Sequence, residues 1–233
     1  MESPAPPRVL ALIPAHDEAP RIGPVVEGAA RHLPVVVVDD GSRDDTAVVA
    51  EAAGATVLRQ QPNRGKGAAL RTGFRHALEG GFDAVVTLDA DGQHDPAEIP
   101  RLLAAFAGGW ASGPRPELVI GRRDFSRMPP SRRAANELGG RVLGLALGQP
   151  IADNQSGYRL IGRRLLERLE RSREDGFEFE VEMIAVCLRE GWGLAWVPIS
   201  TIYAGAPSHI RPVHHLRHFL RAVRQARRTV RSR

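Results

Sequence analysis

The stretch VVVVDDGSRDDTAVVAEAA, residues 35–53, contains the two patterns that decide the fold. Its first part, 35–39, is an uninterrupted valine run ending in Asp39, which predicts a strand buried on both faces. Its second part, 44–53, has helical spacing and begins at Asp44, a residue type that caps helix N-termini. A strand that passes through a short polar turn into a helix is the repeating unit of parallel α/β sheets.

The same alternation continues on both sides of this stretch. Further strands are expected at 9–13, 55–59, 83–89, 117–123 and 193–199, and further helices at 22–33, 65–80, 101–107, 135–148 and 177–191. These units predict an α/β fold with a Rossmann-like, mostly parallel sheet and helices on both faces. Because no repeat or long linker divides the chain, we expect one domain over 8–212, a flexible N-terminus at 1–7 and a basic C-terminal helix at 213–233.

Composition narrows the possible functions. The net charge is +5 and the isoelectric point is about 10.4, yet residues 209–233 hold eight arginines and no Asp or Glu, so the basic character belongs mostly to this tail. No helix-turn-helix, zinc-ligand or aromatic RNA-reading pattern is present, and nucleic acid is not an expected partner. The single cysteine, Cys187, fits a reducing, cytoplasmic setting. Without a signal peptide or a run of about eighteen apolar residues, the protein is expected to be soluble or peripheral to a membrane.

Acidic residues crowd the end of the strand expected at 83–89. TLDADGQHDP, residues 87–96, sets three carboxylates close together, and such groups repel unless a cation compensates them. An EF-hand loop is excluded because glycine at its sixth position and glutamate at its twelfth are missing. Asp95 followed by Pro96 is a good helix start. That explanation leaves Asp89 and Asp91 as candidates for a metal site where parallel sheets bind ligands.

A glycine-rich turn precedes the helix expected at 65–80. NRGKGAALRTGF, residues 63–74, is not a P-loop, because Gly67 follows Lys66 where Ser or Thr is required. The turn could expose backbone N–H groups beside a cation and bind an anion or a nucleotide. Alternatively, Gly65 and Gly67 only make the turn.

Six motifs, in this order, resemble those of glycosyltransferase family 2 with the GT-A fold, and most closely its dolichyl- and polyprenyl-phosphate sugar synthases. They are IPAHDEA (13–19), VVDDGSRDDT (37–46), NRGKGAALRTGF (63–74), TLDADGQHDP (87–96), GRR (121–123) and NQSGYRL (154–160), and the resemblance covers about residues 8–212. It implies an inverting, metal-dependent glycosyltransferase that moves a sugar from a nucleoside-diphosphate sugar to a polyprenyl phosphate. It also implies Mg²⁺ or Mn²⁺ as the cofactor and a peripheral position at the inner face of the cytoplasmic membrane.

The resemblance implies roles for individual residues. Matches to nucleotide-sugar contacts are Pro14, His16, Glu18, Asp39, Asp40, Asp89 and Ala90, joined by Lys66 as the cation of the glycine-rich turn. The metal-site matches are Asp89, Asp91 and Gln93. Catalytic contributions are expected from Asp91, Arg122 and Arg159, because a metal and fixed cations stabilise a leaving diphosphate. An acceptor phosphate would meet Ser156, Arg159, His209 and Arg211.

The chain departs from the family pattern in two places. His16 stands where the family usually has tyrosine, so stacking on the base is expected to differ. Tyr203 and His209 stand where polyprenyl-phosphate enzymes often carry cations, although Arg211 could substitute.

Other functions are weighed against this resemblance. A family-two enzyme could use another lipid or a soluble hydroxyl acceptor, which requires a base such as Asp153 or Glu182. Glu178 and Glu182 share a helical face, while Glu180 points elsewhere. A nucleotidyltransferase is disfavoured because no G-x-G-T-R-L loop follows the first strand. A non-catalytic nucleotide- or membrane-binding module is disfavoured because the acidic motif is intact.

The tail predicts an amphipathic helix on an anionic membrane surface. Its apolar face would consist of Leu216, Phe219, Leu220, Val223 and Val230, flanked by Arg217, Arg221, Arg224 and Arg228. The alternative is that the apolar face packs on the enzyme.

Overall fold

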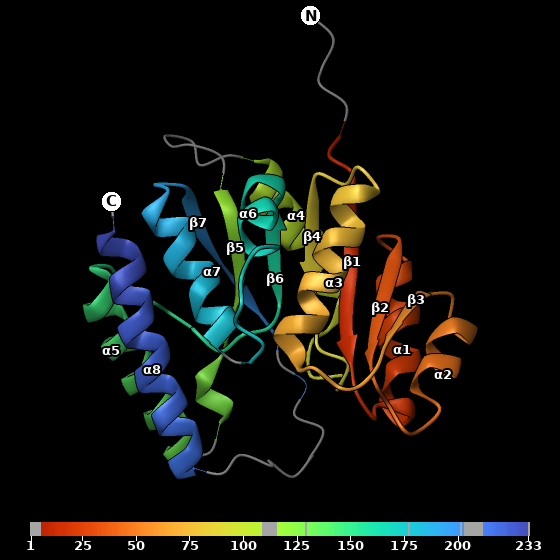
Figure 1. Ribbon diagram of the computed structural model, residues 1–233, viewed down its shortest axis with the longest axis horizontal. Coiled ribbons are helices and arrows are strands. Elements are labelled where there is room, and N and C mark those ends of the chain that lie inside the picture. The colour runs from red at the N-terminus through yellow and green to blue at the C-terminus, as the bar shows by residue number, and fades with distance from the viewer. Residues whose placement is uncertain are drawn as a thin grey trace, which may run out of the picture.

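A computed structural model describes residues 6–108, 116–128, 130–176, 178–200, 202 and 212–232, with the backbone alone at 127, 131–132 and 212–218 (Figure 1). Within these residues, seven strands form one sheet in the order β3-β2-β1-β4-β6-β5-β7. They are β1 (Val9–Ala15), β2 (Val35–Asp40), β3 (Thr56–Gln60), β4 (Ala84–Thr87), β5 (Pro116–Arg123), β6 (Arg159–Gly162) and β7 (Gly193–Ile199).

The sheet is mostly parallel, as predicted, with one exception. β6 runs antiparallel to both of its neighbours, β4 and β5, while all other pairs of strands are parallel. The local sequence of β6 did not predict a strand. The insertion separates β4 from β5 and so divides the carboxyl ends of the parallel strands into two groups, β1, β2, β3 and β4 on one side and β5 and β7 on the other.

Helices cover both faces of the sheet. They are α1 (Ala19–Ala30), α2 (Thr46–Ala52), α3 (Lys66–Glu79), α4 (Ile99–Ala107), α5 (Pro130–Leu147), α6 (Arg163–Leu169), α7 (Glu178–Arg189) and α8 (Pro212–Arg231), with the 3₁₀ turns η1 (Pro96–Glu98) and η2 (Phe125–Arg127). Successive residues of a strand point to opposite faces. Leu10 and Leu12 of β1 therefore join a core with α3, α6 and α7, while Ala11 and Ile13 join a second core with α1, α2 and α4.

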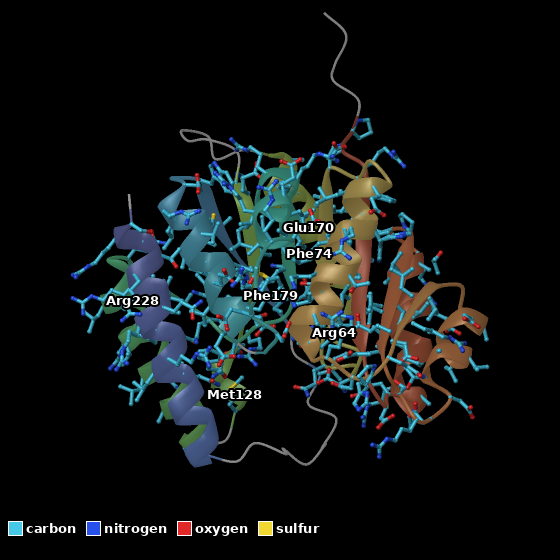
Figure 2. All side chains as sticks on the ribbon, in the orientation of Figure 1. Arg64, Phe74, Met128, Glu170, Phe179 and Arg228 are labelled. Carbon is cyan, nitrogen blue, oxygen red and sulfur yellow. The ribbon has the colours of Figure 1, made fainter. Side chains whose placement is uncertain are left out.

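Aromatic packing joins α3 to α7. The rings of Phe74 and Phe179 face each other between the two helices, with centroids 5.9 Å apart (Figure 2). This contact fixes the N-terminal half of α7 beside α3, and both helices reach the same edge of the sheet.

α8 packs against α7 and α5 (Figure 1). Ala222 and Ala226 are buried and belong to the core that includes α3 and α7. Leu220, which was predicted to lie on the apolar face, is 52% exposed. Val223 and Val230, also of the predicted apolar face, are partly buried and pack against this core, so the packing alternative holds for them; the side chains of Leu216 and Arg217 lie outside the described residues. None of the described helices is long and apolar enough to cross a membrane.

Candidate functional site

A cavity of about 390 Å³ opens where β1, β2 and β4 end. It collects predicted residues from four segments that are distant in the sequence, because the carboxyl ends of parallel strands lie at one edge of the sheet. The lining includes Pro14, His16, Glu18, Asp40, Asn63, Gly65, Lys66, Ala69, Asp89, Ala90 and Asp91. Asp39 is buried and is not part of this lining.

The loops after β1 and β2 hold each other in place. The Asp17 backbone N–H donates to Ser42 Oγ at 3.0 Å, and the Arg43 N–H donates to the Asp17 carboxylate at 2.7 Å. The Glu18 N–H donates to Thr46 Oγ1 at 2.8 Å. These bonds fix the backbone directly after His16, and His16 Nδ1 lies 2.9 Å from the Asp40 carbonyl oxygen, so the wall made by His16 and Glu18 is preformed.

Asp40 organises the glycine-rich turn. Its carboxylate accepts hydrogen bonds from Gln60 Nε2 at 2.5 Å and from the backbone N–H groups of Arg64 and Gly65 at 2.8 and 2.7 Å. The Asp39 carboxylate accepts from the Ser42 N–H at 3.0 Å. Both acids thus shape the turns around the cavity, and recognition of a base or ribose by them stays a prediction.

Asp89, Lys66 and Glu180 form a charged triad at the centre of the site. Lys66 Nζ lies 2.6 Å from Asp89 Oδ1 and 2.8 Å from Glu180 Oε1. Burial alone would raise the pKa of Asp89, but Lys66, His94 and Arg123 together outweigh it and hold this pKa well below its usual range. Burial alone would lower the pKa of Lys66, but the carboxylates of Asp89 and Glu180 raise it. Lys66 is therefore charged throughout the physiological pH range.

The SGYR motif, residues 156–159 within NQSGYRL, lies against the carboxylate of Asp89. A Cβ atom on Gly157 would stand 2.6 Å from Asp89 Oδ2, so only glycine leaves room for this carboxylate. The Gly157 carbonyl accepts from Thr87 Oγ1 at 2.7 Å. On another side, the Asp89 N–H donates to His94 Nδ1 at 3.1 Å. Burial lowers the pKa of His94, although Asp89 opposes this, and a neutral ring suits an accepting Nδ1.

Asp91 is the carboxylate of the acidic motif that faces the cavity without a protein cation. Its two oxygens accept from the backbone N–H and the side-chain amide of Gln93 at 3.0 and 2.7 Å, and no ion pair among the described residues involves it. The same residues contain no cluster of three His, Cys, Asp or Glu side chains suited to hold a metal alone. A hard ion shared between one carboxylate and the phosphates of a substrate fits this donor set. Metal binding by Asp91 stays a prediction, and Gln93 hydrogen-bonds to its carboxylate.

Arg159 lies elsewhere than expected. It is 1% exposed, and its guanidinium donates to the backbone carbonyls of Ser156, Glu180 and Asn154 at 2.8, 2.5 and 3.2 Å. Ser156 is also fully buried, and its hydroxyl has no hydrogen-bond partner among the described residues. The direct contacts with an acceptor phosphate expected of Arg159 and Ser156 are not supported by these positions. The antiparallel β6 turns Arg159 inward, where it ties the SGYR loop to the first turn of α7.

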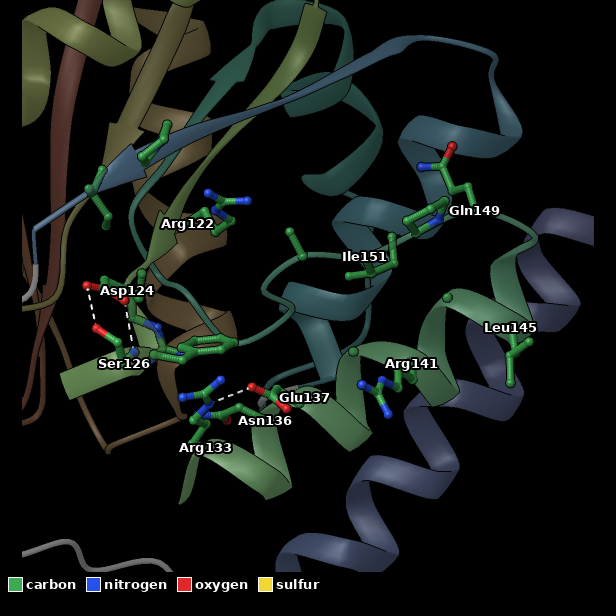
Figure 3. Close-up of a pocket in the computed structure, with 18 of the residues that line it drawn as sticks. Arg122, Asp124, Ser126, Arg133, Asn136, Glu137, Arg141, Leu145, Gln149 and Ile151 are labelled. Carbon is green, nitrogen blue, oxygen red and sulfur yellow. Dashed lines mark hydrogen bonds and ion pairs between the residues drawn. The ribbon is translucent and has the colours of Figure 1, made fainter. Parts of the chain in front are cut away.

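A second cavity, of about 1300 Å³, lies across β6 from the first (Figure 3). The ends of β5 and β7, η2, α5 and the loop that follows α5 enclose it. Four arginines line it, namely Arg122, Arg123, Arg133 and Arg141, together with the apolar residues Phe125, Leu145, Pro150, Ile151, Pro198 and Ile199. Arg122 therefore faces this cavity and does not line the smaller one, where its contact with the leaving diphosphate was expected.

Arg123 connects the two cavities. Its Nε and Nη2 donate hydrogen bonds to the two carboxylate oxygens of Asp153 at 2.7 and 2.9 Å, and Asp153 is almost fully buried. Its charge also contributes to the low pKa of Asp89, after the larger effects of burial, Lys66 and His94. His209 and Arg211, the other predicted acceptor residues, lie outside the described residues.

Comparisons with known proteins identify the family of this chain. The profile of the family described as "Glycosyl transferase family 2" matches residues 11–170. The chain belongs to glycosyltransferase family 2. It is 33% identical over 211 residues to undecaprenyl-phosphate mannosyltransferase of Micrococcus luteus, covering 84% of each chain. It is 30% identical over 210 residues to polyprenol monophosphomannose synthase of Mycolicibacterium smegmatis, covering 83% of this chain and 77% of that relative.

The fold of this family-two glycosyltransferase is GT-A, as predicted. Its structure resembles that of glucosyl-3-phosphoglycerate synthase from Mycobacterium tuberculosis in complex with Mn²⁺, uridine diphosphate and phosphoglyceric acid. The TM-score is 0.73 at 24% identity, over 96% of this chain and 79% of that one. At this level of identity the likeness concerns the fold.

Two acids that could act as a base toward a hydroxyl acceptor are engaged elsewhere in this glycosyltransferase. Asp153 is held by Arg123, and Glu182 accepts a hydrogen bond from the Ser172 hydroxyl at 2.5 Å. Neither residue lines either of the two cavities described above. Glu180, which the helical spacing had set aside, is the glutamate of α7 that reaches the site.

Proposed function

We propose that this glycosyltransferase transfers a sugar from a nucleoside-diphosphate sugar to a polyprenyl phosphate, with inversion at the anomeric carbon and dependence on Mg²⁺ or Mn²⁺. The observation that carries the proposal is the pair of cavities at one edge of the sheet. One contains Asp91 and Lys66, and the other combines arginines with apolar walls. The names of the two relatives, which refer to undecaprenyl phosphate and to polyprenol monophosphomannose, support the acceptor class.

On the donor side, the residues suit a diphosphate. Asp91 would hold a divalent ion against the diphosphate, and such an ion neutralises the charge that develops on the leaving group. Lys66 supplies a fixed ammonium that Asp89 and Glu180 already orient. Electrostatic stabilisation by groups that need no rearrangement contributes most to such a transition state.

On the acceptor side, cations are needed more than a base. The second pKa of a phosphate monoester is about 6, so near neutral pH it is largely an oxyanion and needs no group to remove a proton. Arg122 and Arg141 supply positive charge in the larger cavity, where Arg133 is already paired with Glu137, and Phe125 and Ile151 supply apolar wall. Arginine binds phosphate oxygens through two parallel N–H groups. This lining suits an anionic head joined to a hydrocarbon chain.

Exposed features of α5 and α8 support a peripheral position at the inner face of the cytoplasmic membrane. The outward side of α8 carries only basic charge, from Arg221, Arg224, Arg227, Arg228 and Arg231. On α5, Leu138 and Leu145 are 63% and 86% exposed. Exposed apolar side chains beside arginines are typical of surfaces that contact anionic lipids.

The proposal is tested by assaying the full chain with a panel of radiolabelled nucleotide sugars in Mn²⁺. The acceptors are a short-chain polyprenyl phosphate and the corresponding alcohol. We expect a product from the phosphate alone, with inverted anomeric configuration by NMR, and no product in EDTA. Transfer to the alcohol but not to the phosphate would contradict the acceptor class and favour the hydroxyl-acceptor alternative.

A further inference from the structure

The segment 172–175, between α6 and α7, lies against the N-terminus of α3. The Gly67 N–H donates to the Asp175 carbonyl at 2.8 Å. A Cβ atom on Gly67 would stand 2.6 Å from the Glu174 carbonyl oxygen, and one on Gly65 would stand 2.7 Å from that of Asp175. Both glycines are therefore required by the close approach of another backbone segment. The Gly67 N–H that could have bound an anion is already used.

Side chains strengthen this contact. Arg71, just over one turn along α3 from Lys66, donates to the Glu174 carbonyl and pairs with the Asp175 carboxylate. Lys66 is the first residue of α3, and its ammonium reaches Asp89 from there. Because the helix start is held against segment 172–175, the position of that segment determines where the ammonium of Lys66 can reach.

α8 also contacts segment 172–175, through a side-chain hydrogen bond. Gln225 Nε2 donates to Glu174 Oε1 at 2.8 Å, between the buried residues Ala222 and Ala226 on the inward face of α8. Within the segment, the Glu174 N–H donates to Ser172 Oγ at 3.1 Å. The neighbour of Gln225, Arg224, is exposed.

We propose that segment 172–175 is a clamp that positions Lys66 in the donor cavity, and that Gln225 of α8 holds the clamp in place. This inference rests on the proposed function, since it assumes that Lys66 contacts the donor diphosphate. Gln225 and Glu174 are positioning residues, because both act through α3. The two sides of α8 then have separate roles: the inward side supports donor binding, and the outward arginines are available to anionic lipid.

The test measures binding of UDP and GDP to the full chain in Mn²⁺ by calorimetry, together with KM for the donor and kcat. Glu174→Ala and Gln225→Ala are expected to weaken nucleotide binding about two- to tenfold, the range for one hydrogen bond, and to lower kcat at saturating donor, because a displaced Lys66 also loses its contact with the leaving diphosphate. Gln225→Glu sets two carboxylates against each other and should weaken binding at least as much. Adding Glu174→Gln should restore binding, because the amide then donates to the new carboxylate. Arg224→Gln, one residue away on the outward side, is the matched control and should bind as the wild type does.

The outcomes separate the inference from the function it rests on. A wild-type chain that binds neither nucleotide contradicts the proposed function. If the wild type binds but Glu174→Ala and Gln225→Glu bind equally well, the clamp is wrong. The clamp is also wrong if the single variants have a lower melting temperature but an unchanged nucleotide affinity. It is wrong, too, if Gln225→Glu with Glu174→Gln does not restore the affinity that Gln225→Glu lost. Weakening in the single variants and recovery in the exchanged pair support the clamp, and Gln225→Ala provides the milder variant should Gln225→Glu not fold.

Discussion

The two cavities at the edge of the sheet differ in how many of their charged side chains already form ion pairs. In the smaller one, Asp89, Lys66 and Glu180 are already paired, and Asp40 accepts three hydrogen bonds from the protein. In the larger one, Arg123 and Arg133 are paired with Asp153 and Glu137, but no ion pair among the described residues involves Arg122 or Arg141. A ligand that enters the first meets fixed groups, whereas an anion that enters the second supplies the missing negative charge. This difference suits a donor of defined shape on one side and an acceptor with a long apolar chain on the other.

The largest expected effect removes the carboxylate that distinguishes the donor cavity. Asp91→Asn should lower turnover roughly a hundredfold or more, because the charge that holds the metal against the diphosphate is lost. The melting temperature should be unchanged, since the two side chains have similar size. Asp95→Asn is the matched control: its carboxylate caps η1 through the Ala97 N–H at 2.9 Å, and asparagine caps equally well. Equal turnover in Asp91→Asn and the wild type would remove the metal assignment.

The next effect tests whether the donor cavity is as tightly built as its contacts indicate. Gly157→Ala places a methyl group 2.6 Å from Asp89 Oδ2 and should destabilise the protein by about 1–3 kcal/mol in urea unfolding, with loss of nucleotide affinity. Gly139→Ala, on α5, is the control. Its Cβ would have its nearest neighbour at 3.6 Å, and alanine favours helices, so stability should hold or rise. If both variants behave alike, the Asp89 carboxylate moves aside for the methyl group, and the close contact does not require glycine at position 157.

A smaller and more selective effect is expected in the larger cavity. Arg141→Gln should raise KM for a short-chain polyprenyl phosphate about tenfold and leave the affinity for UDP or GDP unchanged, because a charged hydrogen bond to the acceptor is lost. Arg31→Gln, at the exposed end of α1, should change neither quantity. A change in nucleotide affinity with an unchanged acceptor KM would reverse the assignment of the two cavities.

The smallest effect concerns an acid outside both cavities. Burial raises the pKa of Glu182, against the hydrogen bond from Ser172, so the folded state favours its protonated form. Protonated Glu182 contributes its full stabilisation of the folded state below the pKa of the unfolded chain, near 4.5. This contribution is lost as the pH rises through the higher pKa of the folded state. Glu182→Gln should therefore flatten the decline of the unfolding free energy above about pH 4.5, measured by urea titration, without changing turnover. A loss of turnover would instead support Glu182 as a base.

Most of the parallel sheet could be predicted from the sequence, and the antiparallel insertion could not. The valine run before Asp39 has the composition of a buried strand, and Asp89 and Asp91 follow such a run directly. β6 has four residues, all buried, and no alternation. Its place between β4 and β5 results from pairing between distant segments. The same long-range pairing turned Arg159 inward, which motif matching on the local sequence could not reveal.

The sequence also did not predict which of several adjacent charged residues contacts the site. Helical spacing set Glu180 apart from Glu178 and Glu182, correctly, but the direction in which Glu180 points depends on how α7 packs beside α3. In GRR, both arginines line the larger cavity, and only the position of Asp153 identifies Arg123 as the one held in a buried pair. Sequence alone gives the alternation of a strand but not the partner that each side chain meets.

Lys66 is the only lysine in the sequence, and this gives the site a chemical handle. Reagents that acylate amines react with the neutral amine, whereas the triad keeps this nitrogen protonated by raising its pKa. The lysine side chain is 40% exposed, so slow labelling would reflect its protonation more than its shielding. Acylation of a side-chain amine is thus confined to Lys66. Its rate reports how often the ammonium leaves Asp89 and Glu180.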